Sequence, residues 1–409
     1  MSEAPPAVSG SQTDALRERF ATVAMRSAPP PQLVLESGNG ATVRDVDGRE
    51  YLDFLAGIAV NSLGHAHPVI VEAMSAQASR LVHVSNYFST PQYIAFAERL
   101  VRLSGFGETG RVYAANSGAE AIEAAVKLAR LTGRPRILAF EGGFHGRTMG
   151  ALAVTGKPAL QSPFAPMMPG VEHLQTSREA LEAALARDGG GQVAAVILEP
   201  IKGEAGVVPL PEGFLLEARR LTREHGALLI VDEIQTGAGR TGTWFGFQHE
   251  LGADDLPDAI TVAKGIGGGV PVGALVTRGA ASDLFTLGHH GSTFGGNPLA
   301  TGVADAVLAE IERADLLSAA VERGEQLRSG ILALGSPLVT EVRGRGLLIG
   351  IGLAEPIAAR VVADALHRGL IINAATESSI RLAPPLIIDA HDVDRFLTLF
   401  AASLEASQP

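Results

Sequence analysis

The 409-residue sequence contains no cysteine, and this absence narrows the chemistry that it could perform. Disulfide bonds, iron–sulfur clusters, thiolate zinc sites and a cysteine nucleophile are all excluded. No apolar run reaches the ~18 residues that a bilayer-spanning helix requires. Long basic runs are absent as well, and the formal net charge is −11. Such a chain is a poor match for nucleic acid or an anionic membrane, so we expect neither as a partner and a small-molecule ligand instead.

The residues that are present describe a globular protein. Hydrophobic residues make up 46% of the sequence and charged residues 19%, which separates it from disordered, fibrous and coiled-coil compositions. Its length favours two or three domains, or one large α/β domain with a smaller addition. The first residues, MSEAPPAVSGSQTD, contain an acidic Glu3, two prolines and no apolar core. They resemble neither a signal peptide nor a transit peptide, and we expect a soluble, cytoplasmic protein.

Hydrophobic periodicity divides the chain into two parts. From about residue 61 to residue 297, short β-rich apolar runs alternate with segments of helical period, as in an α/β domain. From about residue 298 the pattern is mostly helical, with one glycine-flanked strand at 347–353. We therefore expect a large α/β domain followed by a smaller one.

Three apolar runs define the geometry of the large domain. Residues 193–198 (VAAVIL), 227–231 (ALLIV) and 260–263 (ITVA) are too continuous for half-exposed strands and are typical of buried parallel strands. Between the first two, residues 212–225 repeat apolar side chains at helical spacing and predict a crossover helix. This βαβ order makes the strands parallel, so their carboxyl ends open at one edge of the sheet, where ligands bind in open α/β folds.

Chemically useful side chains follow these strands directly. Glu199, Asp232 and Lys264 stand just past the three strand ends. A plain buried ion pair would explain an acid and a lysine there, but the segment GIGGGVPVG after Lys264 leaves room for a planar ligand. A lysine in a partly desolvated cleft has a lowered pKa and attacks carbonyls. Pyridoxal phosphate supplies such a carbonyl, and a carboxylate such as Asp232 would keep its pyridine nitrogen protonated.

A phosphate-binding segment is predicted further upstream. Asn116, Ser117, Gly118 and Ala119 lie at the start of a helix that we expect over residues 118–131. Free N–H groups and the positive end of the helix dipole bind phosphate at such a position. Alternatively, Ser117 is an ordinary helix N-cap.

Two further motifs do not support a site. GAGRTG at residues 237–242 matches the dinucleotide-binding pattern G-x-G-x-x-G, but the TWFGFQHE that follows is not a convincing helix. His65 and His67 have no third partner at metal-binding spacing. We interpret the glycines as a turn and the histidines as turn or packing residues, and we expect no metal.

Eight motifs, taken in order, resemble one enzyme family. They read NSGAEAIEAAVKLAR, FHGRTMG, LEPIKGEAGV, DEIQTGAGRTG, KGIGGGVPVGA, HGSTFGGNPLA, RGRGLLIG and RLAPPLII, and the likeness as a whole extends from about residue 43 to residue 388. Together they resemble the class III aminotransferases of the ornithine and acetylornithine type, which belong to fold type I of the pyridoxal-phosphate enzymes. The resemblance implies an α/β fold with a mostly parallel central sheet in a large domain (61–297). A smaller α+β domain would combine the N-terminal segment (1–60) with residues 298–409, in a homodimer with shared active sites.

The resemblance also implies roles for residues around pyridoxal phosphate. Lys264 resembles the catalytic lysine that binds the cofactor's aldehyde and later carries the proton at the substrate carbon. Asp232 resembles the partner of the pyridine nitrogen, and Gln235 the donor to the ring hydroxyl. Phe144 would cover one face of the ring, although a lone Phe is usually a core residue. The phosphate would be bound by Ser117, Gly118 and Ala119, with Thr293 reaching it from the other subunit.

Other residues resemble substrate-binding positions. Arg147 resembles the arginine that receives the substrate's distant carboxylate, and Ser292 lies in another substrate-binding motif. Glu204 and Arg381 resemble a pair in which the glutamate masks the arginine from the amine donor and yields it to the α-carboxylate of 2-oxoglutarate. The pairing is reasonable, because an unpaired buried guanidinium is costly. Lys202 departs from many relatives, which have a neutral residue there, and could compete for Glu204.

Substrate choice depends on two segments. Ornithine aminotransferases place a tyrosine in the segment aligned with Ile58, whereas this position is aliphatic here. The surrounding residues and HVSNYF at 83–88 look more like acetylornithine-using members, which serve arginine biosynthesis. The resemblance thus implies transfer from N²-acetyl-L-ornithine to 2-oxoglutarate, giving N-acetyl-L-glutamate 5-semialdehyde and L-glutamate.

Alternative functions stay open at this point. Ornithine, succinylornithine, succinyldiaminopimelate and 4-aminobutyrate are other amine donors. An aminomutase of the glutamate-1-semialdehyde type is an isomerase that needs no 2-oxoglutarate, but Glu204 and Arg381 argue against it, because a mutase admits no second dicarboxylate. A non-catalytic binding role does not require Lys264 and Asp232 at adjoining strand ends.

Overall fold

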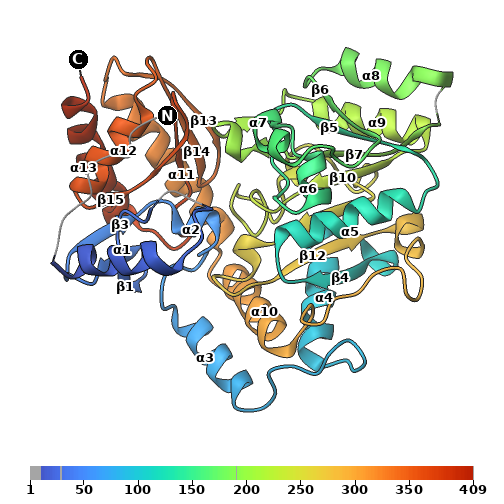
Figure 1. Ribbon diagram of the computed structural model, residues 1–409, viewed down its shortest axis with the longest axis horizontal. Helices are drawn as coiled ribbons and strands as arrows, with labels where there is room; N and C mark the ends of the chain where they lie inside the picture. The colour runs from blue at the N-terminus through green and yellow to red at the C-terminus, as the bar shows by residue number, and fades with distance from the viewer. Residues whose placement is uncertain (1–10, 28–29, 190, 409) are drawn as a thin grey trace.

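Two regions of different build make up the molecule. The structure, a computed structural model, describes residues 11–27, 30–189 and 191–408. Figure 1 shows a broad sheet surrounded by helices on one side and a smaller group of helices and short strands on the other, where both chain ends lie. The first ten residues of the predicted N-terminal segment (1–60) fall outside the described residues.

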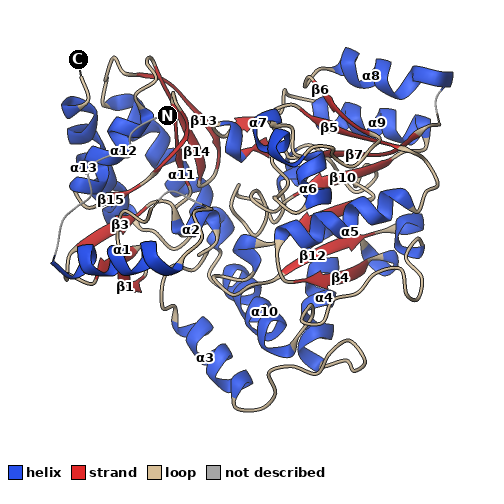
Figure 2. Cartoon of the chain, viewed as in Figure 1, coloured by secondary structure: helices blue, strands red, loops and turns tan. Residues whose placement is uncertain are grey.

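The larger region is built on a sheet with the strand order β4-β12-β11-β10-β7-β5-β6. Neighbouring strands are parallel except at β12, which runs antiparallel to both β11 and β4. The predicted α/β fold with a mostly parallel central sheet is confirmed (Figure 2). The strands are β4 (Arg111–Ala115), β5 (Arg136–Phe140), β6 (Val171–Leu174), β7 (Val193–Leu198), β10 (Leu228–Asp232), β11 (Ala259–Val262) and β12 (Gly273–Thr277).

The three predicted central strands are present within one residue of their expected ends. β7 matches the prediction, whereas β10 begins and ends one residue later and β11 one residue earlier. Along β7, Val196 and Leu198 pack into one hydrophobic cluster, and Ala195 and Ile197 into a second cluster on the opposite face. Because both faces of the sheet are covered, its central strands β7, β10 and β11 are buried and mostly apolar.

Helices cover both faces of this sheet. α5 packs on β12 and β11, and α9 packs on β10 and β7. α9 begins at Phe214 rather than at residue 212 and ends at His225, where Gly226 takes a left-handed conformation. The helices are α1 (Ser11–Val23), α2 (Ala56–Ala59), α3 (Pro68–Ala78), α4 (Pro91–Ser104), α5 (Gly118–Arg130), α6 (Met149–Val154), α7 (Pro158–Gln161), α8 (Arg178–Ala186), α9 (Phe214–His225), α10 (Pro298–Arg313), α11 (Leu316–Ala333), α12 (Ala358–His367) and α13 (Ala390–Ala406).

The C-terminal part contains more strands than the one that was predicted. That strand is β14 (Leu348–Leu353), in a sheet of order β13-β14-β17-β16. The other strands of this sheet are β13 (Val339–Arg345), β16 (Asn373–Thr376) and β17 (Ser379–Leu382). The expectation of a single strand is wrong, because β13 is largely polar and only partly buried, so it lacks an apolar run.

The two ends of the chain meet in another sheet. β1 (Leu35–Asn39), β2 (Thr42–Asp45) and β3 (Glu50–Asp53) form an antiparallel series. β15 (Leu370–Ile371) extends it by pairing in parallel with β3. The remaining short pair is β8 (Ile201–Lys202) with β9 (Val208–Pro209).

The predicted domain boundaries, 1–60, 61–297 and 298–409, stay a prediction. α10 lies just past the second boundary and packs against α3 and α4, as well as against the helix α11 that follows it. Figure 1 shows α10 below the junction of the two regions.

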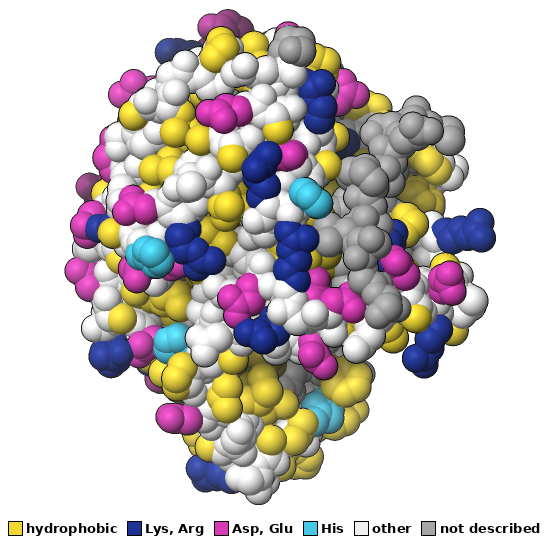
Figure 3. Space-filling view, turned by 90° about the vertical axis from the view of Figure 1, so that its left-hand side faces the viewer, with side chains coloured by type: hydrophobic (Ala, Val, Ile, Leu, Met, Phe, Trp, Pro, Cys, Tyr) yellow, Lys and Arg dark blue, Asp and Glu magenta, His cyan; other side chains and the backbone are white. Residues whose placement is uncertain are grey.

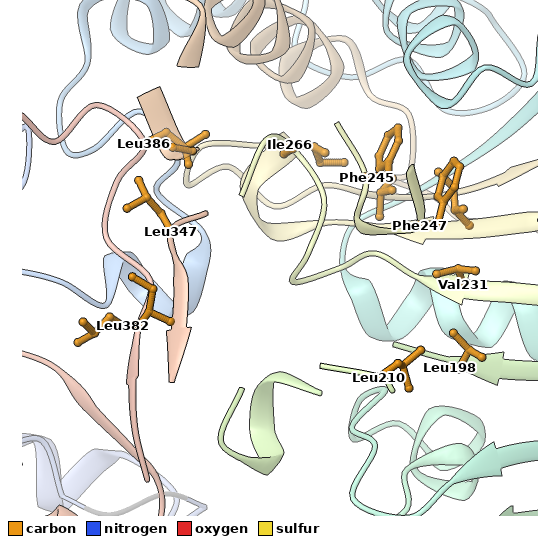
Figure 4. Packing of buried hydrophobic residues seen from close by; sticks show 14 of the residues in the cluster. Leu198, Leu210, Val231, Phe245, Phe247, Ile266, Leu347, Leu382 and Leu386 are labelled. Atoms are coloured by element: carbon orange, nitrogen blue, oxygen red, sulfur yellow. The ribbon is translucent and has the colours of Figure 1, made fainter. Parts of the chain in front are cut away.

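One hydrophobic core continues from the large sheet into the C-terminal sheet. It includes Leu198 and Val231 from the large sheet together with Leu347, Leu382 and Leu386 from the C-terminal part. Figure 4 shows these side chains in one continuous view. The core holds the elements that meet at this junction in fixed relative positions.

The surface of the smaller region is mixed in charge. Figure 3 shows acidic and basic side chains interspersed over that face. No helix among the described residues is long and apolar enough to cross a membrane. The cytoplasmic location stays an expectation.

Candidate active site

A cavity of roughly 360 Å³ opens where the central strands end. Strands β4, β5, β7, β10 and β11 all direct their carboxyl ends to this edge. Seven of the predicted site residues line the cavity: Ser117, Gly118, Ala119, Phe144, Asp232, Gln235 and Lys264. Glu199 lines it as well. The structure thus brings residues separated by much of the sequence into one hollow of the size of a small ligand.

Asp232, the last residue of β10, is fully hydrogen-bonded. Its Oδ1 accepts from the backbone N–H of Ile234 at 3.0 Å and from the Thr261 hydroxyl at 3.1 Å. Its Oδ2 lies 2.6 Å from Nδ1 of His145. Burial disfavours a charged imidazole, but the hydrogen bond and the charge of Asp232 outweigh it and raise the pKa of His145. Three hydrogen bonds therefore hold the carboxylate in one orientation.

Glu199 holds the loop that carries the aromatic residue of the site. Its Oε2 accepts from the backbone N–H of Phe144 at 2.9 Å, and its Oε1 from that of Gly203 at 3.4 Å. Burial raises the pKa of Glu199 to about 7, against the attraction of His145. Glu199 therefore connects the end of β7 to the Phe144 loop.

Lys264 follows β11 in a strained conformation. Its φ of +49° lies in the left-handed region, which side chains other than glycine rarely adopt. Burial and the charge of Arg381 lower the pKa of Lys264, whereas Glu204 and Asp232 favour its charged form. Hydrogen-bond partners of its amine are absent from the described residues. A half-buried amine of lowered pKa that lines a cavity is suited to nucleophilic attack.

The start of α5 forms the wall expected to bind phosphate. Ser117 is its N-cap, and its hydroxyl accepts from the backbone N–H of Glu120 at 3.2 Å. A Cβ on Gly118 would lie 2.8 Å from the side chain of Ile234, so a larger residue here would require Ile234 to shift. Ser117 is therefore a helix N-cap, as the alternative interpretation of the sequence expected. It leaves the other N–H groups of the first turn directed to the cavity edge, where they suit an anion.

Arg381 and Glu204 form an ion pair at the junction of the two regions. Arg381 lies in β17 and is 2% exposed, and Glu204 lies in a 3₁₀ turn (Gly203–Ala205) after β8. One nitrogen of the guanidinium donates to both Glu204 and Gln235, the latter at 3.1 Å, and the other donates to Asn373 at 2.8 Å. The Nε of Arg381 has no hydrogen-bond partner among the described residues. Although burial opposes it, the charge of Arg381 lowers the pKa of Glu204.

Lys202 does not compete for Glu204, contrary to the expectation from sequence. Its ammonium donates to the backbone carbonyl of Glu141 and to the Thr176 hydroxyl, both at 2.6 Å. Backbone carbonyls are not visible as partners in a sequence, which explains the error. The Glu204–Arg381 pair is therefore undisturbed from this side.

Arg147 and Phe144 lie next to each other at the cavity mouth. The guanidinium carbon of Arg147 is 5.9 Å from the centre of the Phe144 ring. Phe144 lines the cavity, whereas Arg147 is exposed. Their predicted roles, in covering a ring and in binding a distant carboxylate, are compatible with these positions and stay predictions.

Of the predicted site residues, five do not line the cavity of their own chain: Arg147, Glu204, Ser292, Thr293 and Arg381. Thr293 is exposed, and Ser292 accepts hydrogen bonds from the Asn116 side chain at 3.2 Å and from Gly295 N–H at 3.0 Å. Ile58 is 38% exposed and does not line the cavity, although Val60 does.

The comparison with known proteins identifies the family. A family model described as aminotransferase class-III matches residues 23–404, almost the whole chain. The chain belongs to the class-III aminotransferases. The recognition made from the eight motifs is confirmed, and the motifs of these aminotransferases account for the residues that line the cavity.

Relatives of this class-III aminotransferase share its length as well as its sequence. Acetylornithine aminotransferase of Mycobacterium tuberculosis is 50% identical over 394 residues, which cover 96% of this chain and 97% of the relative. The enzyme of the same name from Streptomyces coelicolor is 51% identical over 383 residues, 93% of each chain.

Solved structures of other class-III aminotransferases superpose closely. Ornithine aminotransferase from Toxoplasma gondii, whose active site holds pyridoxal phosphate at partial occupancy, gives a TM-score of 0.90 at 32% identity and covers 96% of this chain and 94% of its own. N-acetylornithine aminotransferase from Stenotrophomonas maltophilia gives 0.81 at 35% identity, over 95% of this chain and 98% of its own.

The two motifs set aside from sequence are structural in this aminotransferase. Arg240, within the 237–242 glycine turn, is buried and donates to the backbone carbonyls of Leu347, at 3.2 Å, and Pro384. His65 pairs with Asp53 at 2.8 Å. The described residues contain no cluster of three or more metal-binding side chains.

Sequence reasoning missed the partners of the site residues. His145 stands inside the FHGRTMG motif, but its partner Asp232 is 87 residues away. Asn373 and Gln235, which contact Arg381, likewise come from distant segments. A motif shows which residues matter, whereas pairings of this kind require the fold.

Proposed function

We propose that this class-III aminotransferase transfers the terminal amino group of N²-acetyl-L-ornithine to 2-oxoglutarate, giving N-acetyl-L-glutamate 5-semialdehyde and L-glutamate, a step of arginine biosynthesis. The observation that carries the proposal is the buried Arg381 paired with Glu204 beside the cavity that Lys264 and Asp232 line. Relatives about 50% identical that bear the name acetylornithine aminotransferase support the choice of donor.

Pyridoxal phosphate is the cofactor, and the residues present fit it. Lys264 offers an amine without a hydrogen-bond partner among the described residues, Asp232 offers an oriented carboxylate, and the first turn of α5 offers free N–H groups. When bound, the cofactor supplies a carbonyl for the amine and a ring that accepts the electrons of the substrate carbon. Ser117, Gly118 and Ala119 would bind its phosphate through their N–H groups.

Proton transfer falls to side chains already oriented for it. Asp232 holds a proton at the pyridine nitrogen, and His145 supports it through its hydrogen bond to Oδ2. Lys264 carries a proton to and from the reacting carbon, and burial, which lowers its pKa, favours the neutral amine that accepts this proton. Phe144 excludes water from one side of the site, with its backbone held by Glu199.

Two substrates of different charge must use one site. Glu204 neutralises Arg381 while the amine donor, which has no carboxylate beside its terminal carbon, is bound. When 2-oxoglutarate enters, its α-carboxylate takes the place of Glu204 on Arg381, and Arg147 receives its distant carboxylate. Arg147 serves the donor's carboxylate in the same way.

A direct comparison of donors tests the proposal. The kcat/KM values of acetylornithine, ornithine, succinylornithine and 4-aminobutyrate should be measured side by side with saturating 2-oxoglutarate. We expect acetylornithine to exceed ornithine and 4-aminobutyrate by at least about tenfold. A higher value for either of those two donors would overturn the assignment.

We also propose that the active enzyme is a homodimer in which Thr293 reaches the phosphate of the partner. Large apolar side chains near Thr293 are highly exposed in the single chain, with Tyr87 at 89%, Phe88 at 71% and Phe294 at 61%. Light scattering should give twice the chain mass. Mixed dimers of Lys264→Ala and Thr293→Glu subunits should regain activity that neither variant has alone, whereas an active monomer would refute the proposal.

A further inference from the structure

One lysine at the site has no role in the proposed chemistry. Only four of the 33 lysine and arginine residues are lysines: Lys127, Lys157, Lys202 and Lys264. Lys157 follows α6 and is half-buried beside the turn that carries Glu204. The chain uses arginine almost everywhere else, so a compact ammonium at this position is unusual for it.

The ammonium of Lys157 is only partly used. It donates one hydrogen bond, to the backbone carbonyl of Glu204 at 2.8 Å. An ammonium has three N–H donors, and no second partner of Lys157 exists among the residues that the structure describes. Burial lowers the pKa of Lys157, the charges of Glu204 and Glu199 act in the opposite direction, and Arg381 and Arg147 add to the lowering. Spare donors thus lie within electrostatic range of the Glu204 carboxylate.

The backbone on which Glu204 stands is fixed. The carbonyl of Gly206, just after the turn, accepts from Arg343 Nε at 2.9 Å. Gly206 has a φ of +101°, and a Cβ there would lie 2.8 Å from the Ser379 hydroxyl oxygen. Lys157 is fixed too, because the preceding Gly156 N–H donates to Gly143 at 2.9 Å. Between these anchors, the side chain of Glu204 is what can move.

We propose that Lys157 is a positioning residue that receives the Glu204 carboxylate when a substrate carboxylate replaces it on Arg381. This inference rests on the proposed exchange at Arg381. A carboxylate displaced from Arg381 would otherwise stand partly buried without a cation, which is costly. Lys264 is the other cation that acts on Glu204, but the reaction needs its amine neutral. The Glu204 carboxylate could reach Lys157 by rotation of the Glu204 side chain alone, because the backbone carbonyl of Glu204 already accepts a hydrogen bond from the Lys157 ammonium.

Glutarate, a dicarboxylate without a keto group, tests the inference by binding alone. Its dissociation constant for the holoenzyme should rise about tenfold in Lys157→Met, because the displaced carboxylate loses its partner. The KM of acetylornithine should stay within about twofold, since Glu204 remains on Arg381 in that half-reaction. Lys157→Arg should bind glutarate nearly as the wild type does. Unchanged glutarate binding in Lys157→Met would overturn the inference.

Two controls separate charge from structure. Lys202→Met removes another half-buried ammonium, one bound to Glu141 and Thr176, and should leave glutarate binding unchanged. Lys157→Gln keeps a donor to the Glu204 carbonyl but has no charge, and it should bind glutarate as weakly as Lys157→Met. Binding of wild-type strength in Lys157→Gln would contradict the inference, as would equal weakening in Lys202→Met.

A double-mutant cycle decides whether Lys157 acts through Glu204. In a Glu204→Ala background, Lys157→Met should weaken glutarate binding no further, because no carboxylate needs a partner. An equal loss in both backgrounds would mean that Lys157 contacts the ligand directly, and the inference would be wrong. Failure of the wild type to use acetylornithine would refute the proposed donor instead, and glutarate binding would still report on Lys157.

Discussion

Two carboxylates on different sides of the cavity are held in opposite ways. Asp232 belongs to the central sheet, is 3% exposed and is bound by the N–H of Ile234, the Thr261 hydroxyl and His145. Glu204 stands at the junction with the C-terminal sheet, is less buried, and its carboxylate has a single side-chain partner, Arg381. The Asp232 carboxylate is thus held by residues of the large region, whereas the Glu204 carboxylate depends on a contact between the two regions.

The difference corresponds to two chemical tasks. A group that holds a proton on the cofactor serves both half-reactions and gains from full hydrogen bonding. In the proposed exchange Glu204 must leave its partner for one of two substrates, which suits a partner with incomplete bonding, and the Nε of Arg381 has no hydrogen-bond partner among the described residues. Substitutions at the site should therefore divide into those that impair both half-reactions and those that impair only one.

Loss of Lys264 should abolish both half-reactions. Lys264→Ala removes the amine that carries the proton, and turnover should fall at least about 10³-fold. Purified wild-type protein should be yellow, and the variant should lose the absorbance of the lysine-bound cofactor. Lys127→Ala, at an exposed lysine, is the matched control. A colourless wild-type protein that takes up no pyridoxal phosphate would contradict the roles assigned to Lys264 and Asp232.

Asp232→Asn should impair both half-reactions equally, by about 100-fold. An amide cannot hold the proton at the pyridine nitrogen, and His145 loses its anionic partner. Two single-turnover rates measure these effects: the first half-reaction with acetylornithine and the second half-reaction with 2-oxoglutarate. Unequal losses would mean that Asp232 is not a shared group.

Glu204→Ala should impair only one half-reaction. The rate constant kcat/KM for the amine donor should fall about 30-fold, because Arg381 is left unmasked beside a group without a carboxylate. The half-reaction with glutamate should stay unchanged or become faster. Equal losses in the two half-reactions would mean that Glu204, like Asp232, serves both of them, and would contradict the proposed difference between the two carboxylates.

Arg147→Ala should raise KM for acetylornithine and for 2-oxoglutarate alike, by about tenfold. In the proposed mechanism one exposed guanidinium binds the distant carboxylate of both substrates, so Arg147, like Asp232, would serve both half-reactions. Steady-state kinetics with each substrate varied in turn provide the test. An increase for one substrate alone would refute the shared role.

The smallest effect concerns a buried carboxyl next to Asp232. Burial raises the pKa of Glu233 to about 7 from 4.5. The stability that its protonated form provides is present below about pH 4.5 and is lost as the pH rises through about 7. Glu233→Gln cannot titrate, so Tm should vary with pH less than in the wild type, by about 3 °C between about pH 5 and pH 8. An unchanged pH dependence of Tm would assign that titration elsewhere, with Glu199 as the first candidate.

The sequence predicted the sheet edge better than the junction. The runs at β7, β10 and β11 are mostly apolar because both faces of the sheet are covered, and the residues at their carboxyl ends can therefore be placed from sequence. The C-terminal sheet was largely missed. β13 has polar residues on a partly exposed strand, and β16 and β17 are only four residues long.

Partners were predicted less well than site residues. Asp232 and Lys264 were identified from their positions, but the contact of His145 with Asp232 depends on how the loop after β5 reaches the end of β10. Lys202 was assigned to the wrong partner, because its actual acceptors include the backbone carbonyl of Glu141. Arg381 and Glu204 were paired correctly, and that pairing came from the family resemblance rather than from local pattern.

The pairing of β3 with β15 has a consequence for biosynthesis. The strand partners of Leu52 and Asp53, Leu370 and Ile371, lie more than 300 residues further along the chain. That edge of β3 therefore stays unpaired while the intervening residues are synthesised. Nascent chains arrested before residue 370 should be sensitive to proteases near β3, and chains in which β15 has left the ribosome should be protected.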